Sequence, residues 1–295
     1  MFGHLRTAVS FVAIFVALSG SLVAQRTVPR TFYISATDVQ GAPVLNLTAA
    51  DFQVTENGVT REVSRAALGT TPMRIVLMVD SSTAVGPMMS TFRTALNAFV
   101  DALPESEEVV FISTGGQIRV RAQATDPRDK LRAEIARFAS EGGANAFLDT
   151  LLEADQRFLK TAPAQWPAFV IITSDNGDGT REPNVDDYNK LMNDFLARGG
   201  AAHAVIVQGK RTGPITDIIA NFVDNMGGLR TTINTETSLP ALMKGIANRL
   251  ADDHQRMMTR YTISYAGDLK VTQPEIKVTS SRDGVQLQMS VRRPF

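Results

Sequence analysis

The chain has 295 residues, of which 44% are hydrophobic and 20% are charged, a composition that is typical of globular proteins and excludes disorder throughout. Its formal net charge is zero and no basic patch is interleaved with aromatic residues, so nothing indicates a nucleic-acid partner. The absence of cysteine excludes a thiol nucleophile, a thiolate zinc site and a lipid anchor on cysteine.

The N-terminus has the layout of a secretory signal peptide, which we assign to residues 1–24. A basic start precedes an uncharged apolar segment, and small residues up to Ala24 precede a polar stretch. We expect cleavage near Ala24, but the apolar segment is also about as long as a short membrane helix, so an uncleaved anchor is the competing interpretation. An exported chain without cysteine indicates a secreted or periplasmic bacterial protein, with no stable membrane span after signal cleavage.

Residues 25–70 are predicted to form a β segment. The stretch TFYISATDVQ alternates in polarity, which is typical of a half-buried strand. Asn57-Gly58 favours a two-residue hairpin turn, because both residue types tolerate positive φ. The segment is too short to bury a hydrophobic core by itself.

Residues 71–257 alternate strand and helix patterns. Apolar runs such as RIVLMVD and PAFVIITSD predict strands that are covered on both faces, and apolar residues at helical spacing between the runs predict the covering helices. Residues 117–125 are expected to form a hairpin with the strand before them. The order predicts an α/β fold with a doubly wound, mostly parallel sheet, whose ligands bind at the carboxyl ends of the strands.

Residues 258–295 return to β character, with clear alternation in TISYA and VQLQMSV. Like the N-terminal segment, this segment alone would leave open strand edges and an unburied face. We therefore expect the two β segments to pair into one small β-sandwich, with the α/β unit inserted between them.

Polar side chains follow two of the predicted buried strands. Asp80 and Ser82 come after RIVLMV, and Asp175 comes after PAFVIITS. An acid and a hydroxyl before a helix commonly accept its backbone N–H bonds, and acids beside glycines commonly form turns. Capping and turn formation are therefore the structural alternatives to a binding role.

The combination of IVLMVDSST, a Gly-Gly loop before a helix and VIITSDNGDG resembles the von Willebrand factor type A domain. The surrounding layout is similar to a bacterial subfamily often labelled VWFA-related. It has GAPVLNLTAADFQVTENGV before that domain, a YTISY-like strand after it and a basic-aromatic end like RRPF. The resemblance covers nearly all of the chain after the signal. It implies the type A fold and a non-catalytic role in protein–protein binding of the adhesion type.

In that family, a metal-ion-dependent adhesion site (MIDAS) holds a cation such as Mg²⁺ or Mn²⁺ at the carboxyl edge of the sheet. Its Asp-x-Ser-x-Ser loop supplies a carboxylate and two hydroxyls. The resemblance places Asp80 and Ser82 at the first two of these positions, while the second hydroxyl position is Ala84, which has no oxygen. The site is therefore expected to be degenerate.

Two further loops complete the family's site, with a threonine and an aspartate. The threonine position falls on Asn145 or on Ala144, depending on how one extra residue is placed, and Asp175 matches the aspartate. The metal ligands that the resemblance implies are thus Asp80, Ser82, Asn145 and Asp175. Hard oxygen ligands of this kind suit Mg²⁺.

The histidines give no indication of catalysis. His203 lies in a predicted buried strand, where a hydrogen-bonded core histidine is expected. His254, with Asp252 and Asp253, is expected to lie on a solvated helix face near a helix end. The sequence also contains no nucleophile elbow, no Walker loop and no HExxH motif, so we do not expect an enzyme.

Three hypotheses follow. The first is a secreted binding module that docks an unknown protein partner at the carboxyl edge of the sheet, with or without metal. The second is a structural or assembly component that uses the β-sandwich and keeps only a vestigial metal site. The third is a metal-dependent hydrolase in which Asp80, Asp175 and Asp178 activate water.

Overall fold

The structure is a computed structural model, which describes residues 27–69, 72–176, 179, 184–209 and 215–290. The predicted signal peptide, Asp178 and the terminal RRPF lie outside the described residues. Within the described ranges, none of the helices combines the length and the apolar character needed to cross a membrane.

A six-stranded sheet forms the centre of the larger unit, in the order β10-β9-β8-β5-β6-β7. All neighbouring pairs are parallel except the antiparallel β6–β7 hairpin. Its strands are β5 (Met73–Val79), β6 (Glu108–Ser113), β7 (Arg119–Ala122), β8 (Trp166–Ser174), β9 (Ala201–Val207) and β10 (Arg230–Ile233). The predicted mostly parallel sheet and its hairpin are confirmed.

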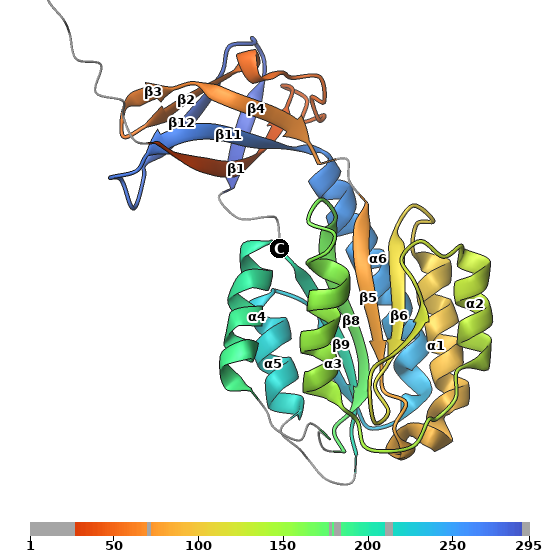
Figure 1. Cartoon of the computed structure of the whole chain (residues 1–295). Helices are drawn as coiled ribbons and strands as arrows, with labels where there is room; N and C mark the ends of the chain where they lie inside the picture. The colour runs from red at the N-terminus through yellow and green to blue at the C-terminus, as the bar shows by residue number, and fades with distance from the viewer. Residues whose placement is uncertain (1–26, 70–71, 177–178, 180–183, 210–214, 291–295) are drawn as a thin grey trace, which may run out of the picture.

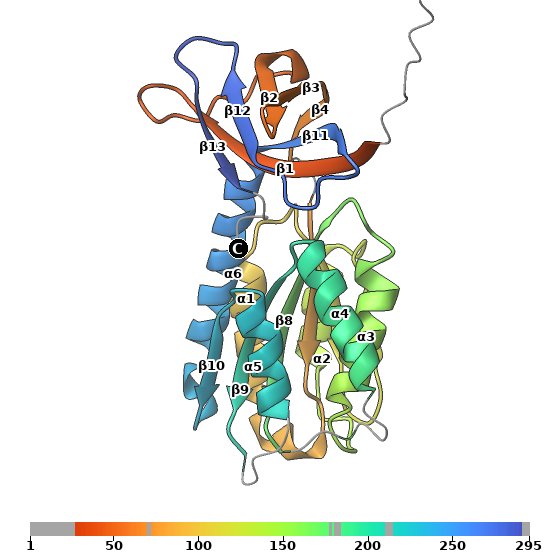
Figure 2. The same cartoon turned by 90° about the vertical axis from the view of Figure 1, so that its left-hand side faces the viewer.

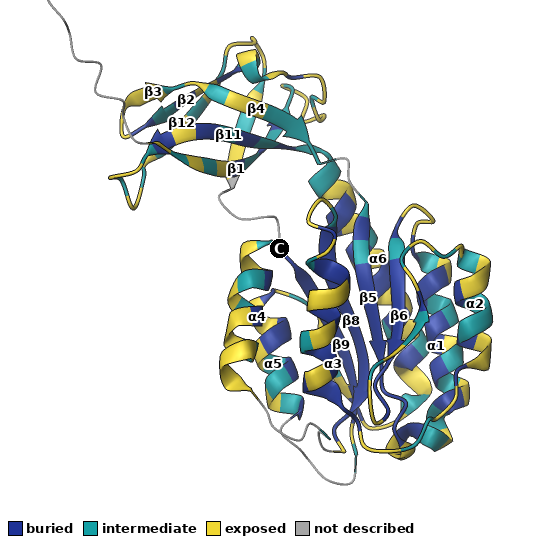
Figure 3. Cartoon of the chain, viewed as in Figure 1, coloured by how far each residue is buried: buried dark blue, intermediate teal, exposed yellow. Residues whose placement is uncertain are grey.

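Helices cover both faces of this sheet (Figures 1 and 2). They are α1 (Met89–Ala102), α2 (Arg128–Arg137), α3 (Phe147–Ala154), α4 (Val185–Ala197), α5 (Ile215–Asn225) and α6 (Leu239–Met258). The first two and the last pack on one face, and the other three pack on the opposite face. The strands between them are almost entirely buried (Figure 3), which explains their continuous apolar sequences.

The remaining strands form a β-sandwich at the amino ends of the central strands (Figure 1). One sheet has the order β13-β1-β11-β4 and the other has the order β12-β2-β3. The strands are β1 (Thr27–Thr37), β2 (Phe52–Glu56), β3 (Val59–Arg61), β4 (Val63–Leu68), β11 (Arg260–Asp268), β12 (Ile276–Ser280) and β13 (Gln286–Ser290). Since β1 and β4 both pair with β11, the N- and C-terminal strands build one sandwich, as predicted, and the α/β unit is inserted between them.

The local sequence explains the sandwich. Inward residues alternate along β1 and β11, so that Phe32 and Ile34 meet Tyr261 and other aromatic and aliphatic side chains in one core. The β2–β3 hairpin turns at Asn57 and Gly58, whose φ values are +49° and +79°. These positive values are those that the Asn-Gly pair favours in a tight hairpin turn.

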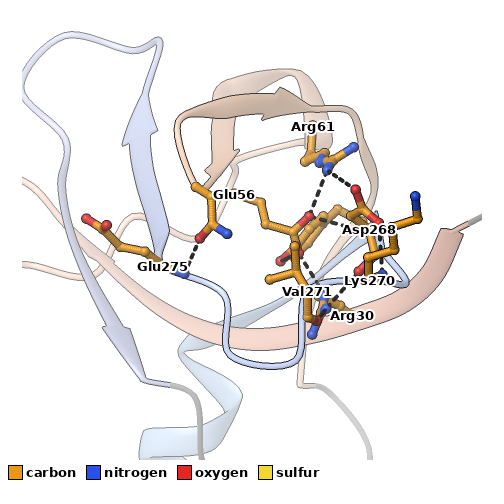
Figure 4. Close-up of polar contacts among 9 residues, drawn as sticks. Arg30, Glu56, Arg61, Asp268, Lys270, Val271 and Glu275 are labelled. Carbon is orange, nitrogen blue, oxygen red and sulfur yellow. Dashed lines mark hydrogen bonds and ion pairs between the residues drawn. The ribbon is translucent and has the colours of Figure 1, made fainter. Parts of the chain in front are cut away.

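A buried carboxylate ties the two sheets of the sandwich together (Figure 4). The Glu56 side chain is fully buried, and its oxygens lie 2.8 Å from Arg30 Nε and 3.0 Å from Arg61 Nη2. It also accepts hydrogen bonds from the backbone N–H of Asp268 and from the Tyr265 hydroxyl. Two guanidinium groups and two hydrogen-bond donors therefore surround its negative charge.

The solvated face predicted around His254 is wrong for His254 and Asp253, whereas Asp252 is exposed as predicted. His254 is buried, with Nδ1 2.7 Å from Glu107 Oε1, and its ring stacks on that of Trp166 at 6.0 Å. Asp253 is buried as well, where it pairs with Arg249 and Arg256. This arrangement could not be predicted from the sequence near α6, because the partner of His254, Glu107, lies far away in the sequence.

His203 in β9 is a core histidine, as predicted. Its Nδ1 accepts a hydrogen bond from the Leu229 backbone N–H at 2.9 Å, and burial lowers its pKa from 6.5 to about 4. The unfolded chain therefore binds a proton as the pH falls below 6.5, whereas the folded chain resists protonation down to about pH 4.

We therefore predict that His203 makes the protein less stable by about 3 kcal/mol as the pH falls from 7 to 4. Denaturant unfolding at several pH values measures this loss. His203→Asn keeps an acceptor for Leu229 but does not titrate, so its stability should fall less over the same interval. Parallel stability curves for the parent and the variant would contradict the prediction.

Candidate functional site

The four residues of the predicted site lie at the carboxyl edge of the parallel sheet, the end of the sheet away from the sandwich (Figure 1). Asp80 follows β5 and Asp175 follows β8, which are neighbouring parallel strands. Ser82 lies just before the 3-10 helix η2 (Thr83–Met88), and Asn145 lies in the loop before α3. Parallel strands end at one edge, so the fold brings these loops together.

Asp80 is buried, and both of its carboxylate oxygens accept hydrogen bonds. Oδ1 accepts from the backbone N–H of Ser82 at 2.8 Å. Oδ2 accepts from the Ser174 hydroxyl at 2.7 Å and from the Ser174 backbone N–H at 3.2 Å. The carboxylate therefore joins the loop after β5 to the end of β8. It does not cap η2, which has no side-chain hydrogen bond at its N-cap, so the capping role considered above is wrong.

Ser82 differs from its neighbours. Its side chain is buried, yet its hydroxyl has no hydrogen-bond partner among the residues that the structure describes. A buried hydroxyl without a partner costs free energy, so this group is available to a ligand at the edge. Ser81 and Thr83 do not share this property, because Ser81 donates to Glu141 and Thr83 donates to the Gly143 carbonyl.

Asn145 fills the position where the family has threonine, and its amide is held on both sides. Its Oδ1 accepts from the Thr114 hydroxyl at 2.5 Å, and its Nδ2 donates to the Thr173 hydroxyl at 2.8 Å. Asp175 is buried too, and its Oδ1 accepts from the Gly209 backbone N–H. Both residues thus fix one loop to another.

Glu141 is a site residue that the sequence analysis missed. Its carboxylate, only 6% exposed, accepts hydrogen bonds from the hydroxyls of Ser81 and Ser113 and pairs with Arg119 and Arg121. The Ser81 hydroxyl is therefore already bonded to Glu141, in contrast to the Ser82 hydroxyl. A single acid before two glycines forms no recognisable sequence motif, so Glu141 could not be found directly. The only sequence signal is that Arg119 and Arg121 lie on one face of the alternating β7 strand, where they could share an acidic partner.

The residues present fit a divalent cation only in part. Asp80, Asp175 and the free Ser82 hydroxyl provide oxygens of the right kind, but Ala84 provides none and the Asn145 carbonyl oxygen is already bonded. Within the described ranges, no group of three acidic, histidine or cysteine side chains is arranged to hold a metal ion. Mg²⁺ demands near-octahedral oxygen coordination, which this donor set does not complete.

Comparison with known proteins identifies the fold. No protein-family model and no curated protein matches the sequence. A solved structure, the von Willebrand factor type A protein from Catenulispora acidiphila, superposes with a TM-score of 0.53 at 12% identity, over 92% of this chain and 74% of that one. The inserted α/β unit has the von Willebrand factor type A fold. We refer to this unit as the type A unit.

A second similar structure contains a metal. Proximal thread matrix protein 1 from the mussel byssus, solved with a zinc-occupied MIDAS motif, matches with a TM-score of 0.50 at 11% identity. The match covers 72% of this chain and half of the mussel protein. At this sequence identity the comparison shows a shared fold only. The zinc is a property of the mussel protein.

Proposed function

We propose that this chain is a secreted or periplasmic, non-catalytic module that binds a partner protein through the loops at the carboxyl edge of its type A unit. The observation that carries the proposal is the hydrogen-bonded edge itself. Asp80, Asn145, Asp175 and Glu141 fasten the described parts of the loops to one another, so this part of the edge is positioned before any partner arrives. A preorganised surface loses little conformational entropy on binding.

The type A fold of the solved relatives supports a binding role of this kind. The chemistry of the edge also favours binding over catalysis. Its carboxylates are bonded to serine, glycine and arginine donors, and the two buried histidines lie at other places in the fold. We further propose that the parent chain docks its partner without a tightly held Mg²⁺ or Mn²⁺, because Ala84 and the bonded Asn145 leave the donor set incomplete.

Site-specific photo-crosslinking tests this proposal. A photoreactive residue at exposed Thr83 places the reactive group on the edge, and one at Val59, which is 54% exposed on β3, places it on the sandwich. On the surface of the producing cells, we expect a discrete adduct from Thr83 and none from Val59. We also expect the Thr83 adduct to persist in chelator.

Each alternative gives a different result. Adducts from Val59 alone would support a structural component that binds through its sandwich. Loss of the Thr83 adduct in chelator would show that docking depends on metal after all. The edge-binding proposal fails if Thr83 gives no adduct under conditions in which Val59 does.

A further inference from the structure

A cavity of about 290 Å³ lies between the β-sandwich and the type A unit. One wall is formed by the strands β1, β11 and β4 of the sheet β13-β1-β11-β4. The other wall comes from the beginning of β8, the residues before it and the last turn of α6. The cavity is thus at the amino end of the parallel sheet, whereas Asp80 and Asp175 lie at the carboxyl end. A strand of nine residues, β8, spans the distance between the two places.

The register of the sandwich explains which side chains reach the cavity. In β1 and β11 the inward residues are buried, so the residues between them face outward. Tyr33, Thr262 and Ala67 lie opposite one another on three adjacent strands and form a row across this outer face. Arg65 and Arg260 follow the same alternation on either side of the row, and all five residues line the cavity.

The two arginines are exceptional in this chain. Neither the Arg65 side chain nor the Arg260 side chain has a hydrogen bond or an ion pair to another described residue. Every other arginine in the described part of the chain has a carboxylate or carbonyl partner. The cavity therefore gathers the two guanidinium groups that lack a partner among the described residues, and its described lining contains no acidic residue.

The surroundings of Arg260 disfavour the positive charge of its guanidinium group. Arg260 is half-buried, and both burial and the positive charge of Arg256 lower the pKa of its guanidinium. The rest of the lining is mainly apolar and includes Leu68, Trp166 and Met257. An apolar pocket with a few convergent polar groups, placed between two folded units, is the common form of a small-molecule site.

We propose that this cavity binds a small organic acid, with its carboxylate held by Arg65 and Arg260 and its apolar body against Leu68, Trp166 and Met257. Guanidinium groups bind carboxylates through paired, charge-assisted hydrogen bonds. The volume is near the lower limit of about 300–1,000 Å³ for small-molecule pockets, which restricts the ligand to a compact molecule. This inference does not depend on the proposed function of the carboxyl edge.

The chain contains one tryptophan, Trp166, so its fluorescence reports directly on the cavity. The probes are 4-phenylbutyrate, its neutral amide 4-phenylbutyramide, decanoate and inorganic phosphate. We expect a saturable change in Trp166 fluorescence with at least one of the two carboxylates, at a Kd below about 1 mM. The amide and phosphate should bind at least about tenfold more weakly than that carboxylate.

Variants separate charge from shape. Arg65→Gln and Arg260→Gln should each weaken carboxylate binding about tenfold, and Ala67→Phe should abolish it by filling the cavity while both charges remain. Arg282→Gln is the matched control, because Arg282 lies elsewhere on the sandwich and bonds Asn46. Circular dichroism confirms that each variant is folded.

The proposal is overturned by any of three results. One is that both carboxylates fail to bind below about 1 mM. Another is that the amide binds as tightly as the acid, because the arginines then contribute nothing. The third is that Arg65→Gln and Arg260→Gln bind the carboxylate as Arg282→Gln does.

Discussion

Replacing Glu56 with alanine is expected to lower the free energy of unfolding of the sandwich by about 3–5 kcal/mol, the typical cost of breaking a buried ion pair. The variant leaves Arg30 and Arg61 without their shared carboxylate. It also removes the acceptor of the Asp268 backbone N–H. Denaturant unfolding followed by tyrosine fluorescence and circular dichroism measures the loss.

Two comparisons make the Glu56 result specific. Glu62→Ala, at an exposed position one residue beyond β3, should change stability by less than about 0.5 kcal/mol. The triple variant Glu56→Leu, Arg30→Met, Arg61→Leu should recover much of the loss, because no unpaired charge remains buried. A loss below about 1 kcal/mol for Glu56→Ala would mean that water satisfies the two arginines instead.

The same carboxylate should make the sandwich sensitive to acid. Burial acts to raise the pKa of Glu56, but the hydrogen bond from the Asp268 N–H and the charge of Arg30 outweigh it, so the pKa lies below its usual value of 4.5. A lowered pKa in the folded state stabilises the protein above pH 4.5 and loses that contribution as the pH falls below it. Glu56→Ala should therefore lack this part of the acid sensitivity.

The second large effect is expected from Ala84→Ser, which restores an oxygen at the degenerate position of the adhesion site. The parent should show no saturable heat with Mg²⁺ or Mn²⁺ in calorimetric titration. The variant should bind at least tenfold more tightly than the parent, a difference of about 1.4 kcal/mol or more. The physical reason is that the unpartnered Ser82 hydroxyl and the Asp80 and Asp175 carboxylates then have a further hard ligand beside them.

Ala84→Val is the matched control, since it enlarges the same side chain without adding an oxygen. Combining Ala84→Ser with Asp80→Ala should abolish the new binding. If the parent binds Mg²⁺ saturably and Asp80→Ala does not, our inference that the donor set is incomplete is wrong. Equal titrations of Ala84→Ser and Ala84→Val would show that position 84 is not what prevents binding.

Much of the fold could be predicted because its signals are local. Long apolar runs exist where a strand is covered on both faces, as in β5 and β8, and strict alternation exists where one face is covered, as in β1 and β11. Even the pairing of the distant β segments followed from the need to bury a face that neither segment could bury alone.

The site was only partly predictable because its decisive features are contacts between loops. The sequence places Asp80 and Asp175 at strand ends, but no pattern shows that Glu141 would take Ser81 or that Thr114 and Thr173 would hold the Asn145 amide. The prediction that His254 is exposed failed for the same reason. Its partner Glu107 comes from a loop 147 residues earlier, and helical periodicity has no information about such a partner.

The insertion of one unit into the other sets an order of folding. Gly69 and Arg260, which bracket the type A unit, are joined by a backbone hydrogen bond of 3.2 Å, so the folded unit holds β4 and β11 side by side. In the unfolded chain these strands are the ends of a long loop whose closure costs entropy. We therefore expect the type A unit to fold first and to act as the template on which the sandwich closes. During synthesis, the edges of β1 to β4 remain unpaired until β11 has been synthesised. We expect the chain to be most prone to aggregation in this interval, because unpaired strand edges can pair with other chains.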